Sequence, residues 1–348
     1  MVILYSGSLK PESATTYRRK ALQRLGQETE GIDADSYAQT SSLLGKVLFR
    51  LSVGPHIARY NRDLIERATK LNPDVFWADK DLLVTPQTLR QLKRRGIITV
   101  SYMSYNPFGP RNDPGWRLHL ETIPFFDLHV VPRQTSVADY KQRGAERVIA
   151  TRFAYEPTVH FPPPLQIMDF QRLREVSFIG SPYDHRADIF STLSRLGFPL
   201  SISGNARAWK RDLPAHAFSK HFVDGELFGV QYREAIWHSK INLSFVTHSN
   251  VDEIAHKSLE IAASGGFLLA ERSEGHMKIF EENSEAVFFS SIEELRDKIN
   301  TYLPNKEARE EIASSGYKRA IKSGYSNDAQ LLPVINEINL IKSLHAGA

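Results

Sequence analysis

The sequence predicts an α/β fold made of two doubly wound domains in tandem. Short apolar runs typical of buried strands alternate with longer stretches of helical pattern, which indicates a parallel sheet covered by helices on both faces. The alternation occurs twice, and the proline-rich stretch Phe161-Pro162-Pro163-Pro164 separates the two series. A chain of 348 residues also exceeds the roughly 250–300 residues at which a single hydrophobic core stops growing.

In the first half, the expected strands and helices follow one another in regular order. The first strand is Val2–Tyr5, which is followed by the turn Gly7-Ser8 and by a helix over residues 14–25. The further strands expected here are 74–78, 97–102, 128–131 and 147–150, and the further helices are 42–71, 88–95 and 137–143. Gly96 and Gly144 end two of these helices, because glycine readily adopts the left-handed conformation found after a helix.

The second half repeats the pattern. The expected strands are 175–179, 200–203, 241–245, 267–270 and 286–289, and the expected helices are 187–196, 231–239, 253–263, 293–302, 306–322 and 327–344. We therefore expect an N-terminal domain over 1–155, a proline-rich linker over 156–174, a C-terminal domain over 175–325, and a final helix over 326–348 for which packing on the N-terminal domain is one option. Ligands of such sheets bind outside the carboxyl ends of the strands.

Composition excludes several classes of protein. The chain has no cysteine, so disulfides, thiolate metal sites and cysteine nucleophiles are excluded. No apolar run reaches the roughly 20 residues that span a bilayer. Residues 1–160 carry 23 Lys+Arg and 16 Asp+Glu, a net +7, while the remainder carries −3. The basic excess has two interpretations: a solvated helix face, or attraction of an anionic acceptor, a membrane surface or nucleic acid.

The segment from Asp252 to Gly266 is the most informative part of the sequence. An acid is expected to open a helix, with Lys257 one turn in and Glu260 three residues later on the same side. An anion at such a helix start meets unpaired N–H groups, and Lys257 suits a pyrophosphate. Glu260 suits a ribose diol, as acids do in other nucleotide sites. The alternative is an ordinary amphipathic helix with an i,i+3 ion pair.

This segment resembles the donor motif of the group 1 GT-B glycosyltransferases, in which two acids separated by seven residues precede a glycine turn. It is most similar to the branch related to bacterial spore-maturation glycosyltransferases, with Lys257 in place of the usual Arg and Leu259 in place of Phe. Other pieces resemble the same branch in the same order: Asn106-Pro107-Phe108-Gly109, Trp116, Phe126-Asp127-Leu128, Gly144-Ala145, Val176 to Ser181 with Arg186, and Gly204-Asn205 with Trp209.

The resemblance implies two Rossmann-like domains that face a cleft, and a nucleotide-diphosphate sugar as donor. It implies transfer without a metal or a further cofactor, with retention at the anomeric carbon. The donor-binding residues would be Gly180, Ser181, Asn205, Trp209, Phe222, Val223, Lys257, Glu260, Gly265 and Gly266. Candidate catalytic residues are Asp252, Lys257, His248 and Asp113, and residues expected on the acceptor or phosphate side are Gly7, Ser8, Thr15, Arg18, Tyr105 and Asn106.

One position departs from the family. Relatives often carry an acid directly before the Asn-Pro-Phe stretch, whereas Ser104-Tyr105 stands here. If that acid has a catalytic role, Asp113 is the substitute that the sequence offers. The acceptor is open: a glycan, a lipid-linked molecule or a protein, either anionic or membrane-associated. The expected location is the cytoplasm, with peripheral attachment to the inner face of the membrane as an option, and polysaccharide biosynthesis is the expected context.

Three alternatives compete with this interpretation. Asp79 and Asp81 form an Asp-x-Asp triplet after a predicted strand, which suits a metal-dependent GT-A transferase because acids hold the divalent ion. A sugar-nucleotide epimerase could use the same GT-B scaffold, since a fold does not determine a function. A nucleotide-sugar-binding protein without catalysis is the third. A nucleic-acid partner is disfavoured, because the sequence shows no zinc finger, helix-turn-helix or arginine-rich tail.

Overall fold

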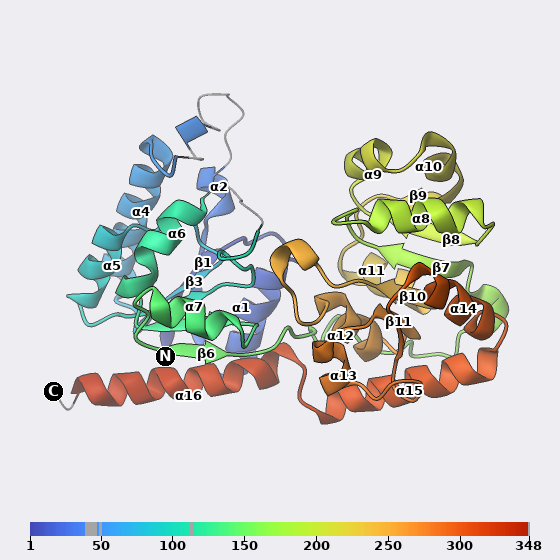
Figure 1. Ribbon diagram of the computed structural model, residues 1–348. Coiled ribbons are helices and arrows are strands. Elements are labelled where there is room, and N and C mark those ends of the chain that lie inside the picture. Colours follow the sequence, from blue (N-terminus) through green and yellow to red (C-terminus); the bar gives the residue numbers. More distant parts are fainter. Residues whose placement is uncertain (39–46, 49–50, 111–114, 347–348) are drawn as a thin grey trace. The chain divides into compact units, whose positions relative to one another are not determined.

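The computed structural model describes residues 1–38, 47–48, 51–110 and 115–346. The chain forms two compact units: unit 1 comprises Met1–Arg152 with Asn327–Ala348, and unit 2 comprises Phe153–Ser326 (Figure 1). Each unit contains a six-stranded sheet in which all neighbouring strands are parallel. The predicted pair of doubly wound α/β domains is confirmed. Residues 156–174, expected as a separate linker, are part of unit 2.

Unit 1 has the strand order β2-β1-β3-β4-β5-β6. The strands are β1 (Val2–Gly7), β2 (Glu28–Asp33), β3 (Val75–Asp79), β4 (Ile98–Tyr102), β5 (Leu128–Val131) and β6 (Val148–Ala150). The helices are α1 (Ala14–Arg24), α2 (Asp35–Ala38), α4 (Pro55–Leu71), α5 (Pro86–Lys93), α6 (Trp116–Thr122), α7 (Ser136–Gln142) and α16 (Asn327–Ala346). Strand β2 was not predicted, because this edge strand is largely polar. The expected helix 42–71 begins at Pro55 as α4, and residues 42–46 and 49–50 lie outside the described residues.

Helix α16 is part of unit 1 although it follows unit 2 in sequence. Its Leu331, Val334, Ile335, Ile338 and Ile341 are buried together with side chains of β1, β3 and β4. At the start of the helix, Asp328 pairs with Arg24 of α1 at 2.7 Å. The Gln330 side chain accepts a hydrogen bond from the Arg152 amide at 2.8 Å. Helix α16 therefore completes the hydrophobic core of unit 1.

Unit 2 has the strand order β12-β11-β10-β7-β8-β9. The strands are β7 (Arg174–Ile179), β8 (Leu200–Ser203), β9 (Phe222–Asp224), β10 (Ser239–Ser244), β11 (Leu268–Glu271) and β12 (Val287–Phe289). The helices are α8 (Arg186–Arg195), α9 (Ala206–Asp212), α10 (Ala215–His221), α11 (Gly229–Trp237), α12 (His256–Ala263), α13 (Glu274–Ile279), α14 (Ile292–Tyr302) and α15 (Lys306–Lys322). Among the described helices, none is both long and apolar enough to cross a membrane.

The order of the strands in unit 2 determines where a ligand can bind. Successive strands are added on one side of β7, and the chain then returns to the other side of β7 to form β10. Helices that follow β7 and β10 therefore lie on opposite faces of the sheet. In sheets with this strand order a crevice is expected between the connecting loops at the carboxyl ends of the two strands, and this is where doubly wound sheets bind ligands.

Candidate functional site

The turns after β7 and β10 form the centre of the candidate site. Gly180 and Ser181 follow β7, and the stretch from Phe245 to Thr247 follows β10. Arg186, the first residue of α8, joins the two turns. Its Nη1 donates to the Ser181 carbonyl at 3.2 Å, and its Nη2 donates to the Val246 carbonyl at 3.0 Å. This buried guanidinium therefore holds the two sides of the crevice at a set distance.

Arg186 is itself in an unusual state. Burial lowers the pKa of its guanidinium, against the opposing influence of nearby acids. Its Nε is buried without a hydrogen-bond partner among the described residues. The sequence shows Arg186 only as a piece of a motif, and its role in bridging two turns became visible in the structure. No local pattern could reveal it, because Val246, the partner on the second turn, lies 60 residues away in the chain.

Two glycines allow the neighbouring turns of β7 and β8 to touch. Gly204 has a φ of +150°, and a Cβ at this position would lie 2.1 Å from the Gly180 carbonyl oxygen. The indole N–H of Trp209 donates to that same carbonyl at 2.8 Å. Trp209 is fully buried in the core of unit 2, so its predicted position beside the nucleotide is wrong. Trp209 instead fixes the orientation of the Gly180 turn.

Helix α12 begins later than the sequence suggested. It starts at His256, with Ala255 as its N-cap, whereas a helix opened by Asp252 was expected. Asp252 lies in the preceding loop, where its carboxylate accepts a hydrogen bond from the Asn250 amide at 2.8 Å. The predicted stabilisation of Asp252 by the helix dipole is therefore wrong. Lys257, in contrast, comes directly after the first residue of the helix.

Lys257 places a cation beside the turn after β7. Its Cε lies 3.6 Å from the position that a Cβ would take on Gly180, and its ammonium lies 4.6 Å from the centre of the Tyr232 ring. Burial lowers the pKa of Lys257, although Glu260 opposes this change. Within the described part of the chain, Lys257 forms neither a hydrogen bond nor an ion pair. The ordinary i,i+3 pair with Glu260 is not formed.

Glu260 is held by groups from three separate segments of unit 2. Tyr232 of α11 donates a hydrogen bond to its Oε2 at 2.9 Å. The Nε2 atoms of His256 and His160 lie 3.6 and 3.8 Å from its Oε1. Burial alone would raise the pKa of this carboxyl group, but these neighbours and Lys257 lower it to about 2. Glu260 is thus an ionised hydrogen-bond acceptor in a mostly buried position.

The histidines around Glu260 are themselves positioned. The Glu156 amide donates to His160 Nδ1 at 3.0 Å, so the proton of the neutral ring is on the Nε2 that faces Glu260. His256 Nε2 donates to the Ala154 carbonyl at 2.7 Å. Sequence reasoning missed both histidines and Tyr232. The i,i+4 spacing of His256 and Glu260 was a usable signal, whereas the other two residues come from distant segments.

His248 lies at the carboxyl edge of the same sheet but is mostly exposed. Its Nε2 is 2.6 Å from Oε1 of Glu271, the last residue of β11. Its backbone amide donates to the Asp184 carboxylate at 3.0 Å. A carboxylate at this distance orients the imidazole ring through a hydrogen bond. His248 is therefore a positioned histidine near the crevice.

Three predicted donor residues have other roles. Asn205 caps α9, because its Oδ1 accepts the Ala208 amide at 3.0 Å. Phe222 stacks on Phe218 with ring centres 4.6 Å apart, and Val223 lies beside it in β9. Strand β9 is the outer strand beyond β8, so Phe222 and Val223 are displaced from the crevice and their predicted contact with the base is not supported.

Gly265 and Gly266 were also predicted to bind the donor, and this prediction is wrong. They end α12 and precede β11, which places them at the amino edge of the sheet, opposite the crevice. Gly265 has a φ of +72°, which a helix-ending glycine adopts easily. A Cβ on Gly266 would lie 2.7 Å from the Ile236 side chain. Both glycines are required for packing at the end of the helix.

Unit 1 uses its predicted polar residues mainly for internal structure. Arg18 is buried and pairs with Asp79 through two contacts of 2.7 Å, so it is not available to a phosphate. Asp81 accepts hydrogen bonds from Ser6 and Tyr60. Burial raises the pKa of Asp81. Asp79 and Asp81 therefore stabilise the interior of unit 1, and they do not form the metal site expected for a GT-A enzyme.

Other predicted acceptor residues lie at the carboxyl edge of the unit 1 sheet. Thr15 donates to the Ser8 carbonyl at 2.6 Å, and Ser8 donates to Asp35 at 2.8 Å. Both hydroxyl groups thus organise the turn after β1. A Cβ on Gly7 would lie 2.8 Å from the Asp79 carbonyl oxygen, so this glycine permits close packing of β1 on β3.

Tyr105 and Asn106 follow β4 at the same edge. The Lys80 ammonium lies 3.8 Å above the Tyr105 ring, and Asn106 accepts the Phe108 amide at 3.0 Å. Lys80 adopts a φ of +53°, which is uncommon for a residue with a side chain. Sequence reasoning missed it. Asp113, the proposed catalytic substitute, lies outside the described residues. Within the described ranges, no group of three or more acids and histidines could hold a metal ion.

Comparison with solved structures identifies the architecture. Sucrose-phosphate synthase from Thermosynechococcus elongatus matches with a TM-score of 0.72 at 12% identity, over 100% of both chains. HepE from Anabaena in complex with UDP-glucose matches with 0.64 at 15% identity, over 100% of this chain and 99% of HepE. The chain has the GT-B fold. The GT-A alternative is therefore wrong.

A further solved structure and a protein family are also similar to this chain. A glycosyltransferase from Rickettsia africae has a TM-score of 0.65 at 14% identity, with 98% of each chain covered. Residues 185–332 match the model of a family described as glycosyl transferase-like. No curated protein matches the sequence. The matched region begins next to Arg186 and includes α12, so it contains both Lys257 and Glu260.

Proposed function

We propose that this GT-B protein is a glycosyltransferase, of the hexosyltransferase class, that uses a UDP-sugar as donor. The observation that carries the proposal is the Lys257 ammonium, half-buried beside the β7 turn and three residues before the ionised Glu260. HepE, with the same fold, has been solved with UDP and with UDP-glucose. The match of residues 185–332 to a glycosyl transferase-like family supports the same activity.

The crevice in unit 2 suits each part of such a donor. Lys257 and the first backbone amides of α12 would bind the diphosphate, because the ammonium and the positive end of the helix dipole lie together at the start of α12. Glu260 Oε1 would accept hydrogen bonds from the ribose hydroxyls. Gly180 lets the backbone approach the phosphates, since it has no side chain there. Asp252, in the loop before α12, would hold hydroxyls of the sugar.

The reaction transfers the sugar from the diphosphate to an acceptor hydroxyl. The acceptor oxygen forms a bond to the anomeric carbon, the bond from that carbon to the diphosphate oxygen breaks, and the acceptor proton leaves with the nucleoside diphosphate or a nearby base. Negative charge grows on the departing diphosphate, and preorganised positive groups stabilise it most. Lys257 and the α12 amides would supply this stabilisation without a metal or a further cofactor. The sequence resemblance favours retention of configuration, which in a single step requires the acceptor oxygen to attack on the face from which the diphosphate departs.

The acceptor side is proposed to lie in unit 1. Ser8, Tyr105 and Lys80 are all close to the carboxyl edge of its sheet, where doubly wound domains bind ligands. The sequence resemblance to the spore-maturation branch favours a role in polysaccharide biosynthesis. We expect the protein to act in the cytoplasm, with peripheral attachment to the membrane if its acceptor is lipid-linked.

Calorimetric titration with UDP tests the donor site. Wild-type protein is expected to bind UDP, and Lys257→Met and Glu260→Gln should each weaken binding at least tenfold, because each removes a charged hydrogen-bond partner. Lys278→Met and Glu274→Gln are matched controls, since both residues are exposed on α13 and should leave binding unchanged.

Turnover is measured separately with a panel of UDP-sugars and candidate acceptors. Release of UDP that depends on the acceptor, together with a glycosylated product, is the expected result. If neither UDP nor another nucleoside diphosphate binds the wild-type protein, the proposal is wrong.

A further inference from the structure

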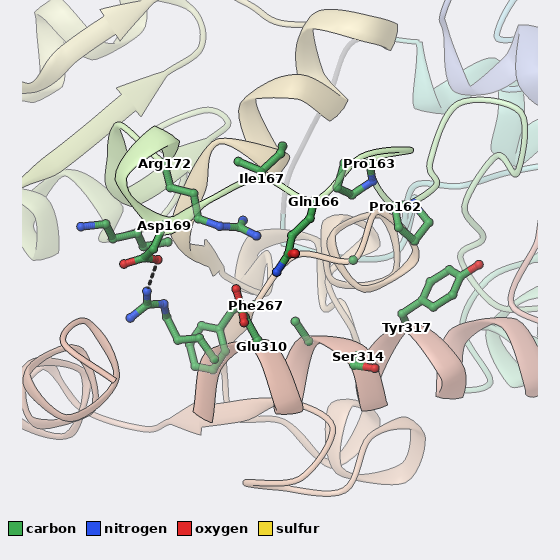
Figure 2. Close-up of a pocket in the computed structure, with 14 residues that line it drawn as sticks. Pro162, Pro163, Gln166, Ile167, Asp169, Arg172, Phe267, Glu310, Ser314 and Tyr317 are labelled. Atoms are coloured by element: carbon green, nitrogen blue, oxygen red, sulfur yellow. Dashed lines mark hydrogen bonds and ion pairs between the residues drawn. The ribbon is translucent and has the colours of Figure 1, made fainter. Parts of the chain in front are cut away.

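A second cavity lies in unit 2 at the edge of the sheet opposite the crevice. Its volume is about 380 Å³, within the range typical of small-molecule sites. Figure 2 shows it between α15 and the segment of residues 162–172, here called the strap. The lining residues are Pro162, Pro163, Gln166, Ile167, Asp169, Arg172, Lys240, Gly265, Phe267, Arg309, Glu310, Ala313, Ser314 and Tyr317. None of the proposed donor-binding contacts involves this cavity.

Much of the cavity wall is apolar. Pro162 and Pro163 contribute ring surfaces from the strap, and Phe267 and Ala313 contribute surface from the sheet and from α15. Proline rings hold the strap in a restricted conformation, so the cavity wall is largely preformed. Such a surface gains most from the burial of an apolar body, at about 25 cal/mol per Å².

Arg172 supplies a directed polar group in this apolar setting. Its Nη1 donates to the Trp237 carbonyl at 2.7 Å and to the Ser239 carbonyl at 3.3 Å. Its Nε and Nη2 have no partner in the part of the chain that the structure describes. Figure 2 shows the guanidinium pointing into the cavity, with the Gln166 amide reaching toward the same space. The free Nε–Nη2 edge matches the two oxygens of a carboxylate.

The other cations of the cavity are already paired. Arg309 contacts Asp169 at 2.5 Å, and Lys240 contacts Glu175 at 2.9 Å. Arg172, in contrast, forms no ion pair within the described part of the chain, although Glu310 and Asp169 act on it electrostatically. Glu310 also faces the cavity, and its carboxylate disfavours a ligand with two negative charges. These groups together select a single negative charge.

We propose that this cavity binds a small monocarboxylate with an apolar body. The carboxylate lies on the Nε–Nη2 edge of Arg172 and accepts a further hydrogen bond from Gln166. The apolar body packs between the prolines of the strap and the α15 surface around Ala313. This is a binding site separate from the donor crevice, and it does not depend on the proposed transferase activity.

Matched pairs of ligands test the proposal on the full chain. Benzoate, phenylacetate and indole-3-propionate are compared with their neutral carboxamides by ligand-observed NMR and calorimetry. At least one carboxylate is expected to bind, and its carboxamide should bind at least tenfold more weakly. Arg172→Lys should weaken the carboxylate at least tenfold, because lysine has no planar edge, while Arg195→Lys, an exposed arginine at the end of α8, should have no effect.

A second variant tests the location without removing a charge. Ser314 is exposed and lines the cavity, so Ser314→Trp should fill the space and abolish binding. Lys318→Trp, one turn further along α15, is the control and should leave binding intact. If no carboxylate binds, if acids and amides bind equally, or if Ser314→Trp binds as well as the wild type, the proposal is wrong. Circular dichroism and thermal unfolding of each variant verify that the fold is retained.

Discussion

Glu260 remains ionised in a nearly buried position because three segments of unit 2 supply groups that favour its charge. Tyr232 donates a hydrogen bond, and the rings of His160 and His256 face the second carboxylate oxygen. A carboxylate held in this way is already desolvated and oriented before a ligand binds. Because this hydrogen-bond acceptor is ordered before binding, the entropic cost of binding a ribose is lower.

The pH dependence of stability provides a test of this arrangement. The pKa of Glu260 is lowered to about 2 in the folded protein, so its ionisation stabilises the fold above the unfolded value near 4.3 and this contribution disappears as the pH falls toward 2. Urea unfolding should show Glu260→Gln less stable than wild type at pH 6, with the difference narrowing by roughly 2 kcal/mol at pH 3. A constant difference across this range would contradict the assignment.

Gly204 permits a second prediction at the scale of one residue. A methyl group at this position would meet the Gly180 carbonyl oxygen at 2.1 Å. Gly204→Ala should therefore lower the free energy of unfolding by about 2 kcal/mol and displace the Gly180 turn, which weakens UDP binding. Gly225 has open space around its Cβ position, so Gly225→Ala is the control. Equal stability of the two variants in urea would show that the turn adapts.

At the scale of the element, the start of α12 shows what sequence reasoning could and could not establish. The order of strands and helices, and Lys257 and Glu260 on one side of one helix, follow from periodicity and spacing. The position of the first turn of that helix could not be predicted from the sequence. Asp252 is an acid of the kind typical of helix starts, whereas the actual N-cap, Ala255, has no side chain that marks a helix start. The burial of Trp209 and Arg18 could not be predicted from the sequence either. Both side chains end in polar groups, and their hydrogen-bond partners lie 29 and 61 residues away in the chain.

Helix α16 allows a test within one element. Ile338 is fully buried against the sheet of unit 1, whereas Leu340, two residues further, is 50% exposed. Ile338→Ala should lower the free energy of unfolding by about 2–5 kcal/mol, because it leaves a cavity in the core. Leu340→Ala should change it by less than about 1 kcal/mol, since exposed positions away from special features tolerate change. Denaturant unfolding followed by circular dichroism measures both variants.

At the scale of the whole molecule, the groups proposed to bind the donor all belong to unit 2. A fragment of residues 153–326 is therefore expected to fold and to bind UDP within about tenfold of the full chain. A fragment of residues 1–152 lacks α16 and should be unstable or aggregate, because its apolar sheet face is uncovered. Calorimetry and gel filtration of the two fragments provide the measurements. Failure of the folded 153–326 fragment to bind UDP, while the full chain binds it, would contradict this division.

The return of α16 to unit 1 has a consequence for how the protein is made. The ribosome completes β1 to β6 first, and then synthesises all of residues 153–326 before α16 emerges. At about 5–20 residues per second, this interval lasts on the order of ten seconds or more. During that time the apolar face of the unit 1 sheet that α16 covers is exposed to solvent. A chaperone that shields apolar chains would have its main opportunity to bind in this interval.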